Sequence, residues 1–232
     1  MIKTMEAVIL AAGIGKRMKP LSYVFPKPLL RLGDKTVIDH IINWLLSNNI
    51  KDIKIVLSDV GRLVELYLKE KYESLSFYYS KPLGTAGQLN AVKNHISSSF
   101  LITYADVVTN FNIKPMFDFH LSNKSVFTIA LKEIQIPIRY GVISHDKTGK
   151  VNSWEEKPNI EIAINAGIYI AEPEIFNYIK EEPSPMNDLV KTLLKEKKPV
   201  YAYHITGELF DIGNMEDYER ANKIFEERLG NI

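Results

Sequence analysis

The chain has 232 residues, enough for one large domain or two small ones, and its 46% apolar and 25% charged residues are those of an ordinary globular protein. Its 29 Lys and Arg balance 28 Asp and Glu, which excludes a global charge that would attract nucleic acid or a membrane surface. The absence of cysteine excludes disulfides, thiolate metal ligands and a cysteine nucleophile. An anionic ligand therefore has to be bound by local groups.

The first half of the chain alternates short β-rich runs with helical segments. Its first apolar run is too short for a signal peptide or a membrane span, so we interpret it as a buried strand and expect a cytoplasmic protein. Further strands are expected at 53–57, 75–79 and 100–104 after this one at 7–12, with helices at 37–49, 61–72 and 85–96. This spacing is typical of βαβ units, and it predicts an α/β fold with a Rossmann-like, doubly wound, mostly parallel mixed sheet flanked by helices.

The second half is less regular. Strands are expected at 126–131, 140–146, 150–158, 165–170 and 200–205, short helices at 173–180 and 186–197, and a final helix at 215–229. With no repeat and no linker, the sequence predicts one domain over 1–232, with a nucleotide-binding half over about 1–110 and a second half over about 111–232. The final helix carries apolar residues that can pack internally, as we expect, or against a second copy, so a homo-oligomer stays open: Tyr218, Ile224, Phe225 and Leu229.

The first candidate binding loop is "LAAGIGKRMKP", which follows the first predicted strand. Gly13 and Gly15 allow the backbone to come close to a ligand, and successive N–H groups in such a loop can bind an anion. The dinucleotide fingerprint fails because its third glycine position is Met18, and the P-loop pattern fails because Arg17 stands where Ser or Thr is needed. The alternative is an ordinary tight turn.

Lys27 stands between two prolines in "FPKPLL". Proline fixes its own φ and restricts the residue before it, so the lysine side chain leaves a stiff backbone and could point an ammonium group at a phosphate. A rigid solvent-exposed loop is the alternative.

Two further features accompany the expected strand ends. Gly84, Thr85 and Ala86 start a predicted helix, where free N–H groups could meet a base or phosphate, unless Thr85 is simply the N-cap. Asp106 follows a buried strand and Asp211 precedes a glycine, and two such carboxylates could share Mg²⁺ with substrate phosphates. Each could instead be a turn or capping residue.

Polar residues beside small ones recur in three segments of the second half. Carboxylate, amide and lysine groups next to glycine could form a pocket for a polyol with an anionic group, or they could be edge polarity and a surface ion pair. The residues lie in "RYGVISHD", "WEEKP" and "NAGIYI": Tyr140, Gly141, Glu156, Lys157, Asn165 and Gly167.

Taken in order, these motifs resemble the sugar-phosphate nucleotidylyltransferases, or nucleotide-sugar pyrophosphorylases. The resemblance runs from about Glu6 to Ala221 through "LAAGIGKRMKPL", "FPKPLL", "PLGTAG", "YADV", "YGVI", "EEKP", "NAGIYI" and "FDIGNMEDYERAN", and it includes the mannose-1-phosphate guanylyltransferase and glucose-1-phosphate thymidylyltransferase types. It implies an Mg²⁺-dependent transfer in which a sugar 1-phosphate attacks the α-phosphorus of an NTP and gives an NDP-sugar and pyrophosphate. Since the motifs end near residue 221, it also implies that no C-terminal β-helix domain follows.

The resemblance implies roles for single residues. Arg17, Lys27 and Lys157 would be catalytic, and Asp106 and Asp211 would hold the metal. The nucleotide would contact Leu10, Ala11, Ala12, Gly13, Gly15, Gly84, Thr85 and Ala86. The sugar phosphate would contact Tyr140, Gly141, Glu156, Lys157, Asn165 and Gly167.

Other functions stay open on the same residues. A cytidylyltransferase for phosphocholine or another non-sugar phosphate shares the first loop, although "EEKP" and "NAGIYI" favour a sugar. A regulatory paralogue could bind a nucleotide sugar without turning it over, although such a protein is expected to lose Arg17, Lys27 or a metal aspartate, and this chain retains them. A dehydrogenase is disfavoured by the missing third glycine.

Overall fold

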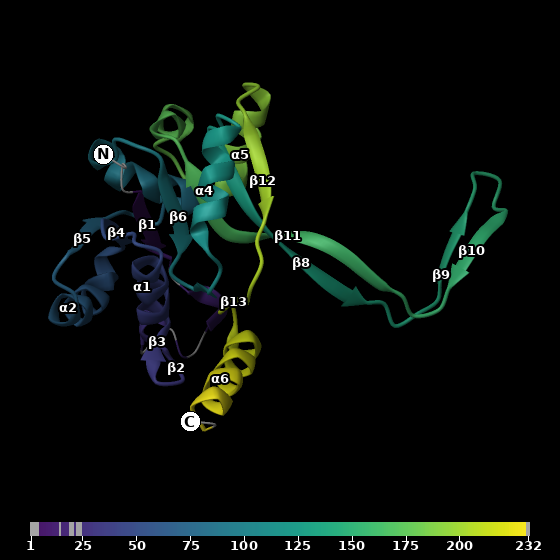
Figure 1. The fold of residues 1–232 in the computed structure, drawn as a ribbon, viewed down its shortest axis with the longest axis horizontal. Coiled ribbons are helices and arrows are strands. Elements are labelled where there is room, and N and C mark those ends of the chain that lie inside the picture. The colour runs from purple at the N-terminus through teal and green to yellow at the C-terminus, as the bar shows by residue number, and fades with distance from the viewer. Residues whose placement is uncertain (1–4, 14, 19–20, 22–24, 231–232) are drawn as a thin grey trace.

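A seven-stranded sheet forms the centre of the computed structural model, which describes residues 5–13, 15–18, 21 and 25–230 (Figure 1). Its order is β12-β8-β11-β6-β1-β4-β5, in which β1 pairs in parallel with β4 and β6, whereas β11 runs antiparallel to β6 and β8. The strands are β1 (Glu6–Ala11), β4 (Ile53–Leu57), β5 (Leu75–Tyr79), β6 (Phe100–Tyr104), β8 (Phe127–Pro137), β11 (Asn159–Ala171) and β12 (Val200–His204). The mostly parallel mixed sheet predicted from the sequence is confirmed.

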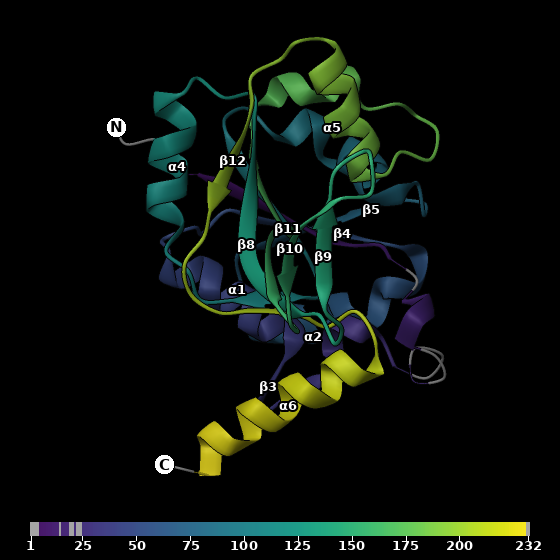
Figure 2. The ribbon, with the colours of Figure 1, turned by 90° about the vertical axis from the view of Figure 1, so that its right-hand side faces the viewer.

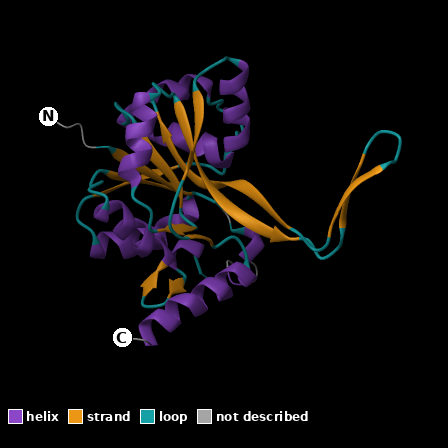
Figure 3. Cartoon of the chain, turned by 45° about the vertical axis from the view of Figure 1, so that its right-hand side comes forward, coloured by secondary structure: helices purple, strands orange, loops and turns teal. Residues whose placement is uncertain are grey.

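Helices cover both faces of this sheet (Figure 3). The α-helices are α1 (Val37–Ser47), α2 (Arg62–Lys71), α3 (Gly84–Gly87), α4 (Ile113–Ser122), α5 (Met186–Lys195) and α6 (Met215–Gly230). Short 3-10 helices are η1 (Lys16–Met18), η3 (Lys27–Leu29), η4 (Asp59–Gly61), η5 (Gln88–His95) and η6 (Pro173–Tyr178). Within the described part of the chain, no helix combines the length and apolar character that a membrane crossing needs.

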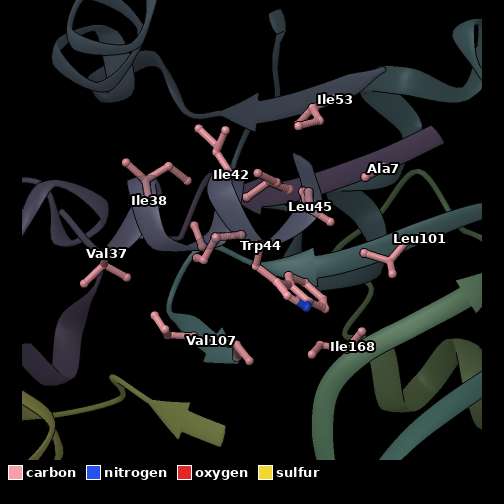
Figure 4. Close-up of a cluster of buried hydrophobic side chains, with 14 of the residues drawn as sticks. Ala7, Val37, Ile38, Ile42, Trp44, Leu45, Ile53, Leu101, Val107 and Ile168 are labelled. Carbon is pink, nitrogen blue, oxygen red and sulfur yellow. The ribbon is translucent and has the colours of Figure 1, made fainter. Parts of the chain in front are cut away.

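Two buried clusters lie on the two faces, and alternate residues of one strand feed each of them. Ala7 and Ile9 of β1 belong to the first cluster, which packs α1 against the sheet (Figure 4), whereas Val8 and Leu10 belong to the second. This alternation follows from the two-residue period of a strand, and it explains why β1 is apolar throughout. The nucleotide-binding half and the second half expected from the sequence contribute to the same sheet, joined where β6 pairs with β11.

Two of the four apolar residues of the final helix pack internally, as expected from the sequence. Tyr218 and Phe225 contact the first cluster, and the Tyr218 hydroxyl donates to the carbonyl of Arg31 at 2.9 Å. Figure 2 shows α6 running along one end of the molecule. The outer end of the helix leaves Leu229 exposed.

The expected helix at 85–96 is a single α-helical turn, α3, followed by the 3-10 helix η5. Two glycines within four residues, Gly84 and Gly87, weaken α-helix formation at its start. The expected strands at 126–131 and 165–170 are longer than predicted and become β8 and β11.

Beyond the sheet, β8 and β11 continue as a two-stranded ribbon that leaves the body (Figure 1). We call residues 132–164 the arm. Its stem is the outer part of β8 and β11, and its tip is the hairpin of β9 (Val142–His145) and β10 (Val151–Glu155). Neither buried cluster includes a residue of the arm.

The smaller strands of the body are β2 (Arg31–Leu32), β3 (Lys35–Thr36), β7 (Val107–Thr109) and β13 (Leu209–Asp211).

Asp39 anchors the start of α1. Its side chain is fully buried and accepts four hydrogen bonds at 2.6–2.9 Å, from Thr36 Oγ1, Tyr67 OH, Lys71 Nζ and Tyr72 OH. Burial alone raises the pKa of this carboxyl, but the hydrogen bonds together outweigh burial and lower the pKa to about 2. The carboxylate is therefore stabilised in the folded state.

We expect this group to make stability depend on pH. Because the folded pKa of Asp39 lies below the unfolded value of 3.8, its contribution is complete above about pH 4 and is lost as the pH falls toward about 2. The contribution amounts to about 2 kcal/mol. Urea unfolding at pH 6 and pH 3 should show about half of this loss, about 1 kcal/mol, in the natural chain, and Asp39→Asn should reduce the difference by that amount. An unchanged difference would show that Asp39 does not cause it.

Candidate active site

The site begins where β1 and β6 end side by side. Leu10 lies opposite Tyr104 in the parallel register, and the N–H of Ala105 donates to the carbonyl of Leu10 at 3.1 Å. Loops that follow adjacent parallel strands open at the same sheet edge, which is where α/β proteins bind ligands. A cavity of about 300 Å³ lies here, lined by Leu10, Ala11, Gly13, Gly15, Arg17, Lys27, Pro28, Thr85, Gln88, Tyr104, Ala105, Asp106 and Gly213.

Lys27 reaches this cavity from the short helix η3. The turn is fixed because the N–H of Leu29 donates to the carbonyl of Pro26 at 2.9 Å and the Leu29 side chain is buried. The ammonium group donates to Asp106 Oδ2 at 2.5 Å, and the lysine side chain is only 12% exposed. The Pro-Lys-Pro segment therefore directs the amine into the cleft.

Asp211 lies beside Asp106 because β13 pairs with β7, the strand that follows Asp106. Asp211 is opposite Val107, and the N–H of Ile212 donates to the carbonyl of Asp106 at 2.8 Å. Burial raises the pKa of Asp211, and repulsion from Asp106 raises it further, while Lys27 and Arg17 act in the opposite direction. The two carboxylates therefore repel each other, and a bound cation would reduce this repulsion.

Arg17 comes from η1, directly after the glycine loop. Its neighbour Met18 is fully buried and holds the turn, in which the N–H of Met18 donates to the carbonyl of Gly15. A Cβ built on Gly213 would lie 3.5 Å from Arg17 Nη1 and 3.2 Å from Asp211 Oδ1. A side chain at position 213 would therefore crowd the Asp211 carboxylate and contact the Arg17 guanidinium.

Gln88 lines the same cavity, although it was not among the residues predicted from the sequence. It is 4% exposed, and its Oε1 accepts the N–H of Ala12 at 3.1 Å. With the oxygen bound in this way, the side-chain amide has a fixed orientation. Gln88 directly follows "GTAG" in the sequence, which could have drawn attention to it. Its hydrogen bond with Ala12, 76 residues away, is visible only in the structure.

Two of the N–H groups at the start of α3 already have partners within the chain. The N–H groups of Ala86 and Gly87 donate to the carbonyl of Ser184 at 2.9 and 3.0 Å. Thr85 is not the N-cap, because Leu83 holds that position and Thr85 Oγ1 accepts the N–H of Met186 at 2.8 Å. A distant loop thus satisfies these groups, which sequence spacing could not reveal.

A second cavity of about 510 Å³ adjoins the first, and Thr85 and Tyr104 line both. Asn165 lines it too, and its amide donates to Tyr169 OH at 2.7 Å while its Oδ1 accepts the N–H of Gly167 at 3.0 Å. Gly167 has φ +71°, and a Cβ there would lie 2.9 Å from the Tyr104 ring. A side chain at this position would displace the wall between the two cavities.

The remaining predicted residues lie on the arm. Tyr140 and Gly141 precede β9 and Glu156 and Lys157 follow β10, so within one chain the structure does not bring them to either cavity. Tyr140 is 78% exposed, and the Trp154 indole donates to Glu156 Oε2 at 3.2 Å. The predicted residues thus form two groups, one in the body and one on the arm.

Arg17, Lys27 and Asp106 line this cleft at the edge where the parallel strands β1 and β6 end, and cationic side chains placed there can bind a phosphorylated ligand. The family model described as "Nucleotidyl transferase" matches residues 6–228. The chain belongs to the nucleotidyl transferase family, which confirms the resemblance stated above. Members of this family generally use a divalent metal ion.

Named relatives agree with this assignment. A mannose-1-phosphate guanylyltransferase catalytic subunit beta from Drosophila pseudoobscura pseudoobscura is 31% identical over 223 residues, covering 92% of this chain and 60% of the relative. The chain thus spans about three fifths of that protein. HddC from Yersinia pseudotuberculosis, solved in complex with GMP-PN, has a TM-score of 0.75 and 26% identity, covering 96% of this chain and 100% of its own. UDP-glucose pyrophosphorylase from Acinetobacter baumanii shares the fold, with a TM-score of 0.75, 18% identity and 98% coverage of both chains.

Proposed function

We propose that this chain transfers a nucleotidyl group from an NTP to a sugar 1-phosphate, giving an NDP-sugar and pyrophosphate. The observation that carries the proposal is the convergence of Arg17, Lys27 and Asp106, from three separate segments, on the cavity beside β1 and β6, with Asp211 held next to Asp106. The family membership and the guanylyltransferase relatives support the same reaction. We expect the enzyme to work in the cytoplasm.

The reaction needs alignment and charge neutralisation more than a general base. The phosphate oxygen of the sugar 1-phosphate is already ionised, attacks the α-phosphorus in line, and pyrophosphate leaves with the bonding electrons. Arg17 and Lys27 would neutralise the negative charge on the triphosphate as the bond to pyrophosphate breaks. The nucleotide would be held by Gln88, by the segment from Gly84 to Ala86, and by the loop residues Leu10, Ala11, Ala12, Gly13 and Gly15.

Asp106 and Asp211 are the residues that would hold a divalent ion, which we propose to be Mg²⁺. Their oxygen-only donor set suits a hard cation. Burial, and after it repulsion from Asp106, raises the pKa of Asp211, and a bound cation would offset both effects. No group of three or more His, Asp or Glu side chains that could hold a metal occurs among the described residues, so phosphates and water would complete the ligand shell. The bound ion would supply Lewis-acid stabilisation of the phosphates.

Asn165 and Gly167 beside the second cavity, with Tyr140, Gly141, Glu156 and Lys157 of the arm, are proposed for the sugar phosphate. The second cavity adjoins the first, as two substrates that react with each other require.

The test is pyrophosphate release in the presence of Mg²⁺ across a panel of NTPs and sugar 1-phosphates, with phosphocholine included. Release with one sugar 1-phosphate and one or two NTPs supports the proposal. Release with phosphocholine alone would identify the cytidylyltransferase alternative. Tight binding of an NDP-sugar, measured by calorimetry, without release from any pair would identify a regulatory protein.

A further inference from the structure

The arm has no cover of its own. Among the described residues, β12 pairs with β8 only as far as Leu131, and β6 pairs with β11 only from Ile168 onward. From Lys132 to Pro137 and from Asn159 to Asn165 the two strands therefore pair only with each other. A two-stranded ribbon in water is marginally stable, and open strand edges invite another chain.

The stem has one apolar and one polar face. Its cross-strand pairs Ile134 with Ile162 and Ile136 with Ile160 fall on one face, which we call the isoleucine face. The other face carries Glu133 opposite Ala163 and Gln135 opposite Glu161. Ile136, Ile160 and Ile162 are 37–43% exposed, and neither buried cluster of the body includes them.

The tip repeats this division. Ile143 lies opposite Trp154, and Val151 opposite His145, on one face of the hairpin. Trp154 is 66% exposed and Val151 58% exposed. Apolar surface of this extent along a projecting ribbon marks an interaction site.

The charge of the arm indicates what kind of partner it fits. A neutral ribbon does not select nucleic acid or an anionic surface, whereas two copies of an apolar face are complementary to each other in a two-fold arrangement. The arm balances five cationic against five anionic residues: Lys132, Arg139, Lys147, Lys150 and Lys157 against Glu133, Asp146, Glu155, Glu156 and Glu161.

The root of the arm lies at the second cavity. Leu131 and Asn165 face each other in register where the arm leaves the sheet, and both line that cavity. A second copy bound along the arm would therefore lie next to the second cavity of this chain.

We propose that two copies of this chain exchange arms, with their isoleucine faces packed together and each tip lying against the body of the partner beside its second cavity. Exchange of an identical element is a low-cost route to a dimer. It also explains why Glu156 and Lys157 lie away from the cavities of their own chain. The shared site rests on the proposed function, whereas the dimer does not.

The first experiment measures mass in solution by sedimentation equilibrium. We expect two chains of 26.5 kDa per particle for the natural protein. The double variant Ile136→Lys with Ile162→Lys should raise the dissociation constant by at least about a hundredfold, because charge is placed in an apolar interface. The matched control, Gln135→Lys with Glu161→Lys on the polar face of the same strands, should stay dimeric. A monomeric natural chain, or equal masses for both double variants, would overturn the proposal.

The second experiment mixes two inactive chains, Lys27→Ala and the pair Glu156→Ala with Lys157→Ala. Exchanged arms give mixed dimers in which one site carries all the substitutions and the other none, so the mixture should recover up to about one quarter of natural activity. Mixed dimers without recovery would show that the tips do not complete the partner's site. If the natural chain is inactive on every substrate pair, the proposed function is wrong. The dimer interface is then still tested by the comparison of masses.

Discussion

Replacing Lys27 by alanine should lower kcat for pyrophosphate release by on the order of a hundredfold or more. The ammonium group is held in the cavity by the Pro26–Pro28 backbone and donates to Asp106, so it would meet the phosphates at a fixed position. Such a preorganised charge acts mainly on the transition state, and KM should change much less than kcat. Initial rates over a range of NTP concentrations measure both constants.

A matched control exists in Lys35→Ala, because Lys35 is an exposed lysine on β3 whose contact with Asp34 is a surface pair at 4.0 Å. Its kinetics should equal those of the natural chain. A melting curve for Lys27→Ala separates a loss of chemistry from a loss of folding. Natural kinetics in a folded Lys27→Ala protein would remove Lys27 from the mechanism.

Asp106→Asn should lower kcat by about 100- to 1000-fold and weaken the response to Mg²⁺. This residue lies at the end of β6, pairs with Lys27 and faces Asp211, so its loss removes a proposed metal ligand together with the partner that holds the lysine. Rates measured against Mg²⁺ concentration should require more metal for half-saturation. Calorimetry of Mg²⁺ binding with NTP present gives a second readout.

Asp118→Asn is the control for charge, because this exposed aspartate on α4 pairs with Lys114 away from the cavity. It should leave both the rate and the metal dependence unchanged. A natural Mg²⁺ response in the Asp106 variant would assign the metal to other groups.

The sequence predicts the parallel part of the fold well for a physical reason. Strands β1, β4, β5 and β6 are buried or half-buried between helices, so they appear as short apolar runs, and the predicted ranges agree with the observed ones to within a residue. The rule that ligands bind at the carboxyl ends of such strands then locates Asp106 and the glycine loop.

The other features of the fold and the site depend on contacts between segments that are distant in the sequence. Nothing near Ala86 in the sequence predicts that its N–H donates to the carbonyl of Ser184. Likewise, nothing near Ala12 predicts that its N–H donates to the side chain of Gln88. The stem of the arm did carry a local signal, since "KEIQI" and "NIEIAI" alternate polar and apolar residues, as a strand with one apolar face does. The body of the chain supplies no cover for that face, so its use could not be predicted from periodicity alone.

Strand β11 changes register between Asn165 and Tyr169, at the point where Gly167 takes its positive φ. Residues beyond this irregularity belong to the central sheet, and residues before it belong to the arm. Insertions, deletions or a transplanted hairpin between residues 138 and 158 would therefore leave every ladder of the seven-stranded sheet intact. Folding of the body therefore places no constraint on these residues, so the arm can change without loss of the close-packed core, and only the proposed roles of the arm would restrict its sequence.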